Sequence, residues 1–287
     1  MNEQHLGDGA AHPVAAASTP PVIEATARTD VGLRRHVNED ALLAEHPVYL
    51  VADGMGGHDA GDLASAAAIG AFDELQGRGL ALTIADVESA IGAARTAVDA
   101  VAQGTERGAG CTLTGAILID YEGEPLWYVL NIGDSRVYQH SGSGMTQITD
   151  DHSLHAELEA AGSADAAHTP RNVITRALGS EDARHDGWLL PLRTGARLLV
   201  CSDGLTSEVP DEEIRAVLTV GGRSEPVAEE LVRRALEHGG RDNVSVIVVD
   251  TVSAGSAGTG PIRAIGADAD DEEDTQETIE VTRPVKR

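Results

Sequence analysis

Aromatic residues make up only 2% of this 287-residue sequence, so its core must be filled mainly by Val, Leu, Ile and Ala. Such a chain also has few aromatic surfaces on which nucleic-acid bases could stack. Basic residues are outnumbered, with 21 Lys and Arg against 47 Asp and Glu, and the net charge is -26. A surface of that sign repels phosphate backbones and anionic membranes. We therefore expect neither nucleic acid nor membrane as a partner.

Cysteine and long apolar runs are scarce as well. Cys111 and Cys201 each lie in an apolar run without a CxxC spacing, so both are predicted to be small buried residues rather than zinc ligands or a redox pair. No apolar run approaches the ~18 residues that span a bilayer. The N-terminus lacks the basic and apolar segments of a secretion signal. We expect a cytoplasmic protein and a monomer.

Composition divides the chain into one domain and two tails. Residues 1–21 are rich in Ala, Pro and small polar residues, and residues 253–287 turn from Gly, Ser and Ala to a run of acids. Both are predicted to be disordered, because they have too little apolar surface to form a core. Residues 22–252 suit a single catalytic domain. Within it, residues 149–179 interrupt the β pattern and look like an excursion from a sheet.

The hydrophobic pattern of that domain alternates between strands and helices. Apolar runs predict strands, and spacings of three and four predict helices that bury one face. We expect an α+β fold with four layers, α/β/β/α, in which two antiparallel sheets pack face to face and helix pairs flank them. The predicted strands cover residues 22–31, 39–44, 48–53, 111–120, 125–132, 136–138, 196–201 and 244–250, and the predicted helices cover 61–75, 84–101, 154–161, 210–220 and 224–238.

Acidic residues recur where apolar strands end. Asp53, Asp134 and Asp203 each follow such a strand, Asp242 comes just before one, and the pair Glu39 and Asp40 lies at the edge of another. If the sheets bring these ends together, so many like charges stay ionised only with cations among them. Oxygen ligands favour Mg²⁺ or Mn²⁺ over zinc. A single Asp-Gly pair would indicate only a turn.

Seven short motifs follow one another in this region. In order and in spacing they resemble the bacterial branch of the metal-dependent type 2C (PPM family) protein Ser/Thr phosphatases, over residues 23–250. The motifs are Arg35-x-x-Asn38-Glu39-Asp40, Asp53-Gly54-Met55-Gly56-Gly57-His58, Gly110-Cys111-Thr112-Leu113, Gly133-Asp134-Ser135-Arg136, Thr149-Asp150-Asp151-His152-Ser153, Cys201-Ser202-Asp203-Gly204-Leu205 and Arg241-Asp242-Asn243.

The resemblance implies Mn²⁺ or Mg²⁺ as cofactor, with two core ions and a looser third ion. It implies that Asp53 bridges the two core ions, that the carbonyl of Gly54 binds the first, and that Asp203 and Asp242 hold the second. Asp134, together with Asp203, resembles the ligand pair of the third ion.

The same resemblance gives expectations for the remaining motifs. Glu39 and Asp40 match positions that orient ligands or bind the ions through water. Residues 149–179 resemble the mobile flap of the bacterial enzymes, which bears on substrate access.

The implied reaction is hydrolysis of phosphoserine or phosphothreonine by direct attack of a metal-bridging hydroxide. Arg35 would clamp the phosphate oxygens, and it has the family spacing that its competitor Arg34 lacks. His58 is the nearest candidate by sequence for the acid that protonates the leaving group, with a structural role as the alternative. The other histidines singled out, His152 and His168 in the flap, are predicted to be structural.

Two other functions stay open on sequence. One is a catalytically silent family member that binds phosphopeptides or a partner, although no implied metal ligand is missing. Another is a regulatory phosphatase for one small signalling protein, which the absence of a sensor domain disfavours. The expected partners are phosphoproteins made by a Ser/Thr kinase. Thr275 and Thr278 in the acidic tail could accept phosphate and bind a phosphothreonine-binding domain, and the alternative is a tail that only solvates the protein.

Overall fold

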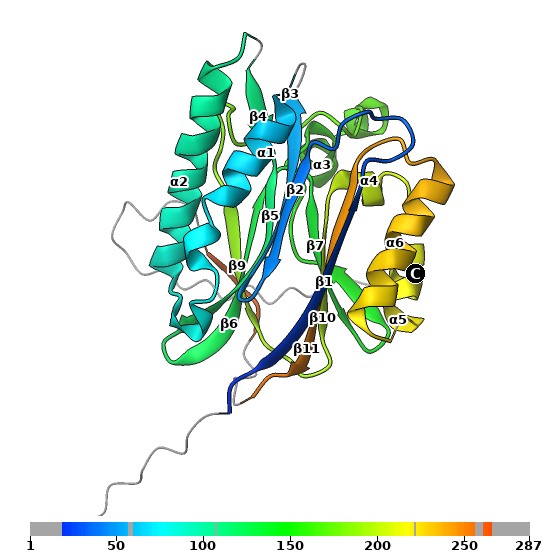
Figure 1. Cartoon of the computed structure of the whole chain (residues 1–287). Helices are drawn as coiled ribbons and strands as arrows, with labels where there is room; N and C mark the ends of the chain where they lie inside the picture. The colour runs from blue at the N-terminus through cyan, green and yellow to red at the C-terminus, as the bar shows by residue number, and fades with distance from the viewer. Residues whose placement is uncertain (1–18, 57–59, 107, 221, 256–260, 266–287) are drawn as a thin grey trace, which may run out of the picture.

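The computed structural model describes residues 19–56, 60–106, 108–220, 222–255 and 261–265. Two antiparallel sheets pack face to face, and helices cover both outer faces (Figure 1). This confirms the predicted α+β architecture of four layers.

The larger sheet has seven strands, in the order β12-β9-β6-β5-β3-β2, with β4 paired to the end of β3. Its strands are β2 (Asp40–Glu45), β3 (Val48–Gly56), β4 (Ala109–Cys111), β5 (Leu113–Tyr121), β6 (Glu124–Ile132), β9 (Asp186–Pro191) and β12 (Arg263–Ile265). The smaller sheet has five strands in the order β1-β11-β10-β7-β8. They are β1 (Val22–Asp30), β7 (Arg136–Ser141), β8 (Gly144–Gln147), β10 (Arg197–Cys201) and β11 (Val244–Ser253).

The helices form one pair on each side of the sandwich, and short helices lie near the sheet ends (Figure 1). Helices α1 (Gly61–Gly70) and α2 (Ile84–Gln103) cover the larger sheet, and α5 (Asp211–Val220) and α6 (Ser224–His238) cover the smaller. The short helices are α3 (Leu154–Ala160), α4 (Asp203–Thr206) and the 3₁₀ turns η1 (Asp73–Leu75), η2 (Gly79–Ala81) and η3 (Ala164–His168).

Helix α2 shows how the sequence sets these boundaries. Thr83 caps its first turn by accepting a hydrogen bond from the Asp86 backbone, and the Asp86 side chain accepts one in return from the Thr83 backbone. This capping box satisfies two backbone donors that a helix start otherwise leaves unpaired. Val87, Ile91 and Val98 then recur at helical spacing and are buried against the larger sheet.

The core consists of three apolar layers, one between the sheets and one beneath each helix pair. Aliphatic side chains fill all three, and the few aromatic ones include Tyr49 and Trp127, whose rings meet edge to face between the sheets. Cys111 and Cys201 are both buried, as predicted, and neither forms a disulfide. None of the helices in the described part of the chain is long and apolar enough to cross a membrane.

Several elements differ from the sequence-based expectation. The predicted helix over residues 61–75 ends at Gly70 and is followed by the 3₁₀ turn η1. The predicted strand over residues 111–120 is split by Thr112 into β4 and β5. Strand β9 was not predicted at all.

The tails need one correction. Strand β12 lies within residues 253–287, which were predicted to be disordered, yet Arg263–Ile265 pair with Leu189, Trp188 and Gly187 of β9. The predictions for residues 1–18 and 266–287, including Thr275 and Thr278, fall outside the described residues.

Candidate metal centre and active site

The acidic residues begin to gather where β3 ends. The register of β2 and β3 sets Asp40 directly opposite Asp53. Just beyond this pair, the Gly54 backbone N–H donates to the carbonyl oxygen of Glu39 at 3.1 Å. Strand pairing therefore places Glu39 and Asp40 next to Asp53 and Gly54 of β3.

Gly54 lies too close to its neighbours for any side chain. A Cβ atom built there would stand 2.2 Å from the carbonyl oxygen of Gly61 and 2.5 Å from that of Glu39. Helix α1 starts at Gly61 and so packs directly against Gly54, the residue of β3 that follows Asp53. The glycine is required for this close approach of two backbones.

Thr112 fixes the backbone of Asp53 from the other side. Its hydroxyl oxygen accepts a hydrogen bond from the Asp53 N–H at 2.9 Å, and its own N–H donates to the Asp53 carbonyl at 2.9 Å. The hydroxyl also lies 3.0 Å from that of Ser135, the neighbour of Asp134. The break between β4 and β5 thus connects two of the predicted ligand positions.

The end of β10, in the smaller sheet, lies at the same edge of the sandwich as Asp40 and Asp53. We call this edge, with Asp40, Asp53, Asp134 and Asp203, the acidic rim. Ser202 donates from its hydroxyl to Asp40 Oδ2 at 2.9 Å, and that hydroxyl accepts from the Ser245 N–H at 3.0 Å. Asp203 follows as the first residue of α4. A Cβ atom on Gly204 would lie 1.9 Å from the Asn243 carbonyl oxygen, so α4 packs tightly on the start of β11.

Asn243 ties the loop between β1 and β2 to this rim. Its side-chain oxygen accepts from the Glu39 N–H at 2.9 Å, and its amide nitrogen donates to the carbonyls of Val31 and Val37, each at 3.0 Å. These bonds hold the loop at both ends. The sequence indicated Asn243 only as part of a motif, because its role depends on contacts more than 200 residues away.

Arg35 projects from that loop toward the acidic residues. Its guanidinium donates to Asp242 Oδ2 at 2.8 Å and lies 3.6 Å from Glu39 Oε2. The side chain is 47% exposed, so it can reach both the carboxylates and a ligand from solvent. The carboxylates of Asp242, Glu39 and Asp53 raise the pKa of Arg35 against the effect of its partial burial. Arg34, its competitor by sequence, makes no such contact with a described residue.

Asp134 lies between the sheet ends and the predicted flap. It is 7% exposed, and it lines a cavity of about 110 Å³ together with Asp203 and with flap residues such as Asp151 and Arg171. Arg136 forms a bidentate ion pair with Asp151, at 2.8 and 2.6 Å. The flap base is thereby fixed beside Asp134.

His152 holds the flap in place through two hydrogen bonds. It is buried, and its Nδ1 accepts a hydrogen bond from the Gly133 N–H at 3.1 Å. The neutral ring then carries its proton on Nε2, which donates to Asp186 Oδ2 at 3.0 Å. This geometry agrees with the structural role predicted for His152. His58 falls outside the described residues.

Burial and mutual repulsion dominate the electrostatics of this rim. Desolvation, with smaller contributions from neighbouring carboxylates, raises the pKa of Asp40 to about 6 and that of Asp134 to about 7. The pKa of Asp53 is also raised, first by burial and then by Asp40 and Asp203. Burial and Asp242 raise the pKa of Asp203. The raised pKa values mean that these four acids are not all ionised at the same time unless positive charge is added.

The donor set fits a hard divalent cation. Asp40 Oδ1 and Asp134 Oδ1 are buried without a hydrogen-bond partner among the described residues. Buried carboxylate oxygens of this kind need compensation, and positive charge from a cation provides it. Among the described residues, no group of three or more His, Cys, Asp or Glu side chains is arranged so that it could hold a metal ion as it stands. The side chains of Asp53 and Asp203 are nevertheless in hydrogen-bond contact, which lowers the pKa of Asp203 against the effect of burial.

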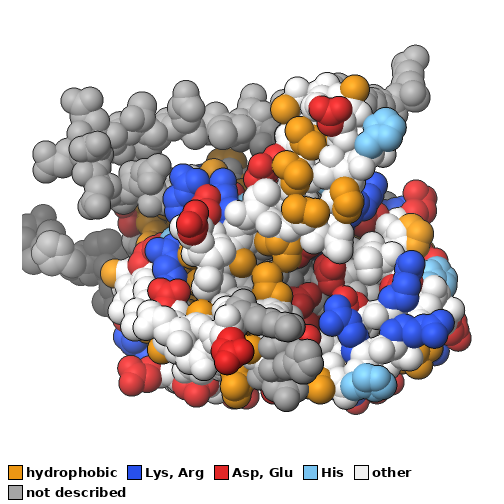
Figure 2. All heavy atoms as spheres, turned by 90° about the horizontal axis from the view of Figure 1, so that it is seen from above, with side chains coloured by type: hydrophobic (Ala, Val, Ile, Leu, Met, Phe, Trp, Pro, Cys, Tyr) orange, Lys and Arg blue, Asp and Glu red, His pale blue; other side chains and the backbone are white. Residues whose placement is uncertain are grey.

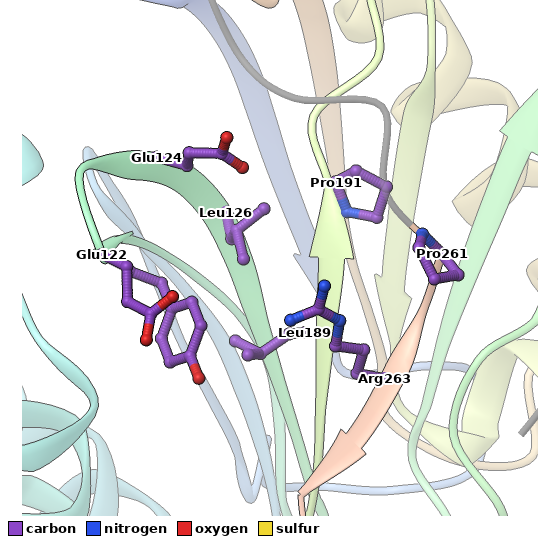
Figure 3. Close-up of a pocket in the computed structure, with 8 residues that line it drawn as sticks. Glu122, Glu124, Leu126, Leu189, Pro191, Pro261 and Arg263 are labelled. Atoms are coloured by element: carbon purple, nitrogen blue, oxygen red, sulfur yellow. The ribbon is translucent and has the colours of Figure 1, made fainter. Parts of the chain in front are cut away.

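A larger cavity lies away from these residues. It measures about 260 Å³ and is formed by the β5–β6 turn, β9 and β12, with Glu122, Leu189 and Arg263 in its lining (Figure 3). None of the predicted site residues lines it. Although this cavity is the larger of the two, it contains none of the acids of the acidic rim.

The fold and the acidic rim define a class of protein, and comparison with known proteins identifies it. The protein phosphatase 2C family model matches residues 34–245. This chain belongs to the protein phosphatase 2C family.

Relatives in bacteria share most of this domain. The serine/threonine phosphatase stp of Listeria innocua is 35% identical over 240 residues, which cover 78% of this chain and 94% of that protein. The serine/threonine protein phosphatase PstP of Mycobacterium tuberculosis is 37% identical over 253 residues, covering 85% of this chain and 48% of that protein.

Solved structures agree with this assignment. The M. tuberculosis phosphatase PstP/Ppp superposes with a TM-score of 0.72 at 34% identity, covering 80% of this chain and 99% of that one. The catalytic domain of PstP in complex with two manganese ions gives 0.71 at 34% identity, covering 81% of this chain and 100% of that one.

Proposed function

We propose that this protein is a metal-dependent phosphatase that hydrolyses phosphoserine and phosphothreonine in proteins. The observation that carries the proposal is the meeting of Asp40, Asp53, Asp134 and Asp203 at one rim, buried and with raised pKa values. A buried cluster of ionised acids is costly unless a cation neutralises part of their charge. Membership of the protein phosphatase 2C family supplies the reaction.

Mn²⁺ or Mg²⁺ would be the resident ion, as a core pair with a looser third. We assign Asp53, the Gly54 carbonyl, Asp203 and Asp242 to the core pair, and Asp134 with Asp203 to the third. Support comes from the unpartnered Asp134 Oδ1 and from the two manganese ions in the PstP complex. When bound, the ions supply positive charge that offsets the phosphate charge and makes water a stronger acid.

Glu39 and Asp40 would support these ligands without binding the ions directly. Asp40 already accepts a hydrogen bond from Ser202, and Glu39 lies within 3.6 Å of Arg35, so each has a partner that orients it. Support of this kind fixes the direction in which a ligand faces. We assign both to orientation or to contact through water.

Arg35 would bind the phosphate oxygens of the substrate. Its guanidinium stands at the open side of the rim, and Asp242 already orients it. A planar guanidinium with its pKa raised stays charged and donates two parallel hydrogen bonds to a phosphate. Charge that builds on the phosphate oxygens as the ester bond breaks would be stabilised by the same contact. His58 remains the candidate for protonating the leaving group.

Turnover of p-nitrophenyl phosphate with added Mn²⁺ tests the proposal. Asp53→Asn and Asp203→Asn should each lose at least about 100-fold in kcat/KM, since even residues that only support a ligand cost 10–100-fold. Asp99→Asn is the matched control, because Asp99 is exposed on α2 and has no described partner. It should keep wild-type activity.

The outcomes separate two functions. If the wild-type protein turns over nothing with Mn²⁺ or Mg²⁺, the catalytically silent member that binds phosphopeptides is the correct description. Phosphoproteins are the proposed partners in either case. A cytoplasmic location, a monomeric state and a phosphothreonine-binding partner for the tail stay predictions from the sequence.

A further inference from the structure

Beside the acidic rim, the loop between β1 and β2 presents positive charge on a fixed backbone. The Leu33 N–H donates to the Gly240 carbonyl at 2.6 Å, and the Asn38 side chain donates to the Thr29 hydroxyl at 2.8 Å. Together with the bonds from Asn243, these contacts fix the loop on both sides of Arg34. A side chain on such a loop loses less freedom when it binds a ligand.

Arg34 is exposed and has no hydrogen bond or ion pair with any other described residue. Its neighbours differ: Arg35 bonds Asp242, and Arg241 bonds the buried carboxylate of Glu208. Many of the described arginines have an ion pair with an acid, as Arg28, Arg136 and Arg197 do. An unpaired arginine one residue from the phosphate-binding candidate is therefore available to a ligand.

The face above the sheets shows the same charge separation. In Figure 2, blue Lys and Arg side chains gather beside a recess in which red Asp and Glu side chains lie. A substrate that enters this recess passes the cationic side. The whole chain has a net charge of -26, which repels an acidic segment, so arginines beside the recess would attract such a segment locally.

We propose that Arg34 binds a carboxylate next to the phosphorylated residue, so that the enzyme prefers phosphopeptides with acidic flanking residues. This rests on the proposed function and names the substrate class that the site selects. Arg34 is a specificity residue here, because it touches the substrate outside the reacting phosphate. An exposed ion pair of this kind changes affinity by about 1.5- to 5-fold.

Two phosphothreonine peptides test the proposal, identical except that Glu on both sides of the phosphothreonine is replaced by Gln. For the wild type, kcat/KM should be about 1.5- to 5-fold higher with Glu, mainly through a lower KM. In Arg34→Gln that ratio should fall to about 1, and in Arg34→Lys, which keeps the charge, most of it should remain.

Arg223→Gln is the matched control. Arg223 is also exposed without a described partner, but it lies just before α6, at the opposite end of that helix from Gly240. This variant should keep both the activity and the ratio. A non-specific charge effect would instead lower the ratio equally in Arg223→Gln and Arg34→Gln, and it would overturn the proposal.

The assay separates failure of this inference from failure of the proposed function. If the wild type hydrolyses p-nitrophenyl phosphate but treats both peptides alike, the proposal for Arg34 is wrong and the phosphatase assignment stands. A preference that survives in Arg34→Gln also refutes it. Absence of all turnover would instead overturn the assignment on which the inference rests. As a further check, Arg34→Glu should prefer peptides flanked by Lys over those flanked by Glu.

Discussion

Asp134 should make the metal-free protein less stable as the pH rises from 5 to 8. Burial and nearby carboxylates raise its pKa from 3.8 to about 7. At pH 5 the folded protein therefore holds a proton on Asp134 that the unfolded chain has lost. From pH 5 to about pH 7 the folded state binds one proton more than the unfolded chain, so the free energy of unfolding falls as the pH rises and levels off above pH 7.

The size of the loss follows from the interval between pH 5 and the folded pKa. About two pH units at about 1.4 kcal/mol each give a decrease of up to about 3 kcal/mol from Asp134. Asp134→Asn removes the ionisable group, so the variant should lose about 3 kcal/mol less than the wild type over the same range.

Urea unfolding at pH 5 and pH 8, with a chelator present, measures both values. Asp99→Asn, an exposed change of the same type, should show the wild-type dependence on pH. Saturating Mn²⁺ should remove the loss at pH 8, because a bound cation favours the ionised carboxylate. If the wild type and Asp134→Asn lose the same stability between the two pH values, the burial argument for Asp134 is wrong.

Three further changes test how the site is held. Gly54→Ala places a Cβ 2.2 Å from the Gly61 carbonyl and should cost about 1–3 kcal/mol of unfolding free energy and most of the turnover, measured by thermal melting and phosphatase assay. Asn243→Ala removes three hydrogen bonds and should cost about 2–4 kcal/mol in urea unfolding, and a cost under about 0.5 kcal/mol would show that the loop is held otherwise. His152→Ala removes the contact with Asp186 and should speed hydrogen exchange across residues 153–175, with unchanged exchange in α6.

The acidic residues were predictable from sequence because their pattern is local. An Asp that follows an apolar run, as Asp53 and Asp203 do, can be recognised in one dimension, although β3 continues past Asp53 to Gly56. The helices followed in the same way from their spacing, and α2 agrees closely with its predicted span. Their meeting at one rim was a hypothesis that only the strand pairings could test.

The supporting residues were harder to predict, since their roles depend on register between distant segments. Nothing near Thr112 indicates that its hydroxyl bonds the Asp53 backbone, 59 positions away. Strand β9 was missed because its six residues show no clear alternation of apolar and polar side chains. These residues form a strand because they pair with β6. A three-residue strand such as β12 lies below what periodicity can detect.

The hydrogen bond from Ser202 to Asp40 joins one sheet to the other at the rim. The two halves of the sandwich therefore converge on acids whose repulsion opposes their own closure. A cation that neutralises these acids would therefore stabilise the fold as well as take part in catalysis. The amount of intact enzyme, and not only its rate, would then follow the supply of manganese or magnesium.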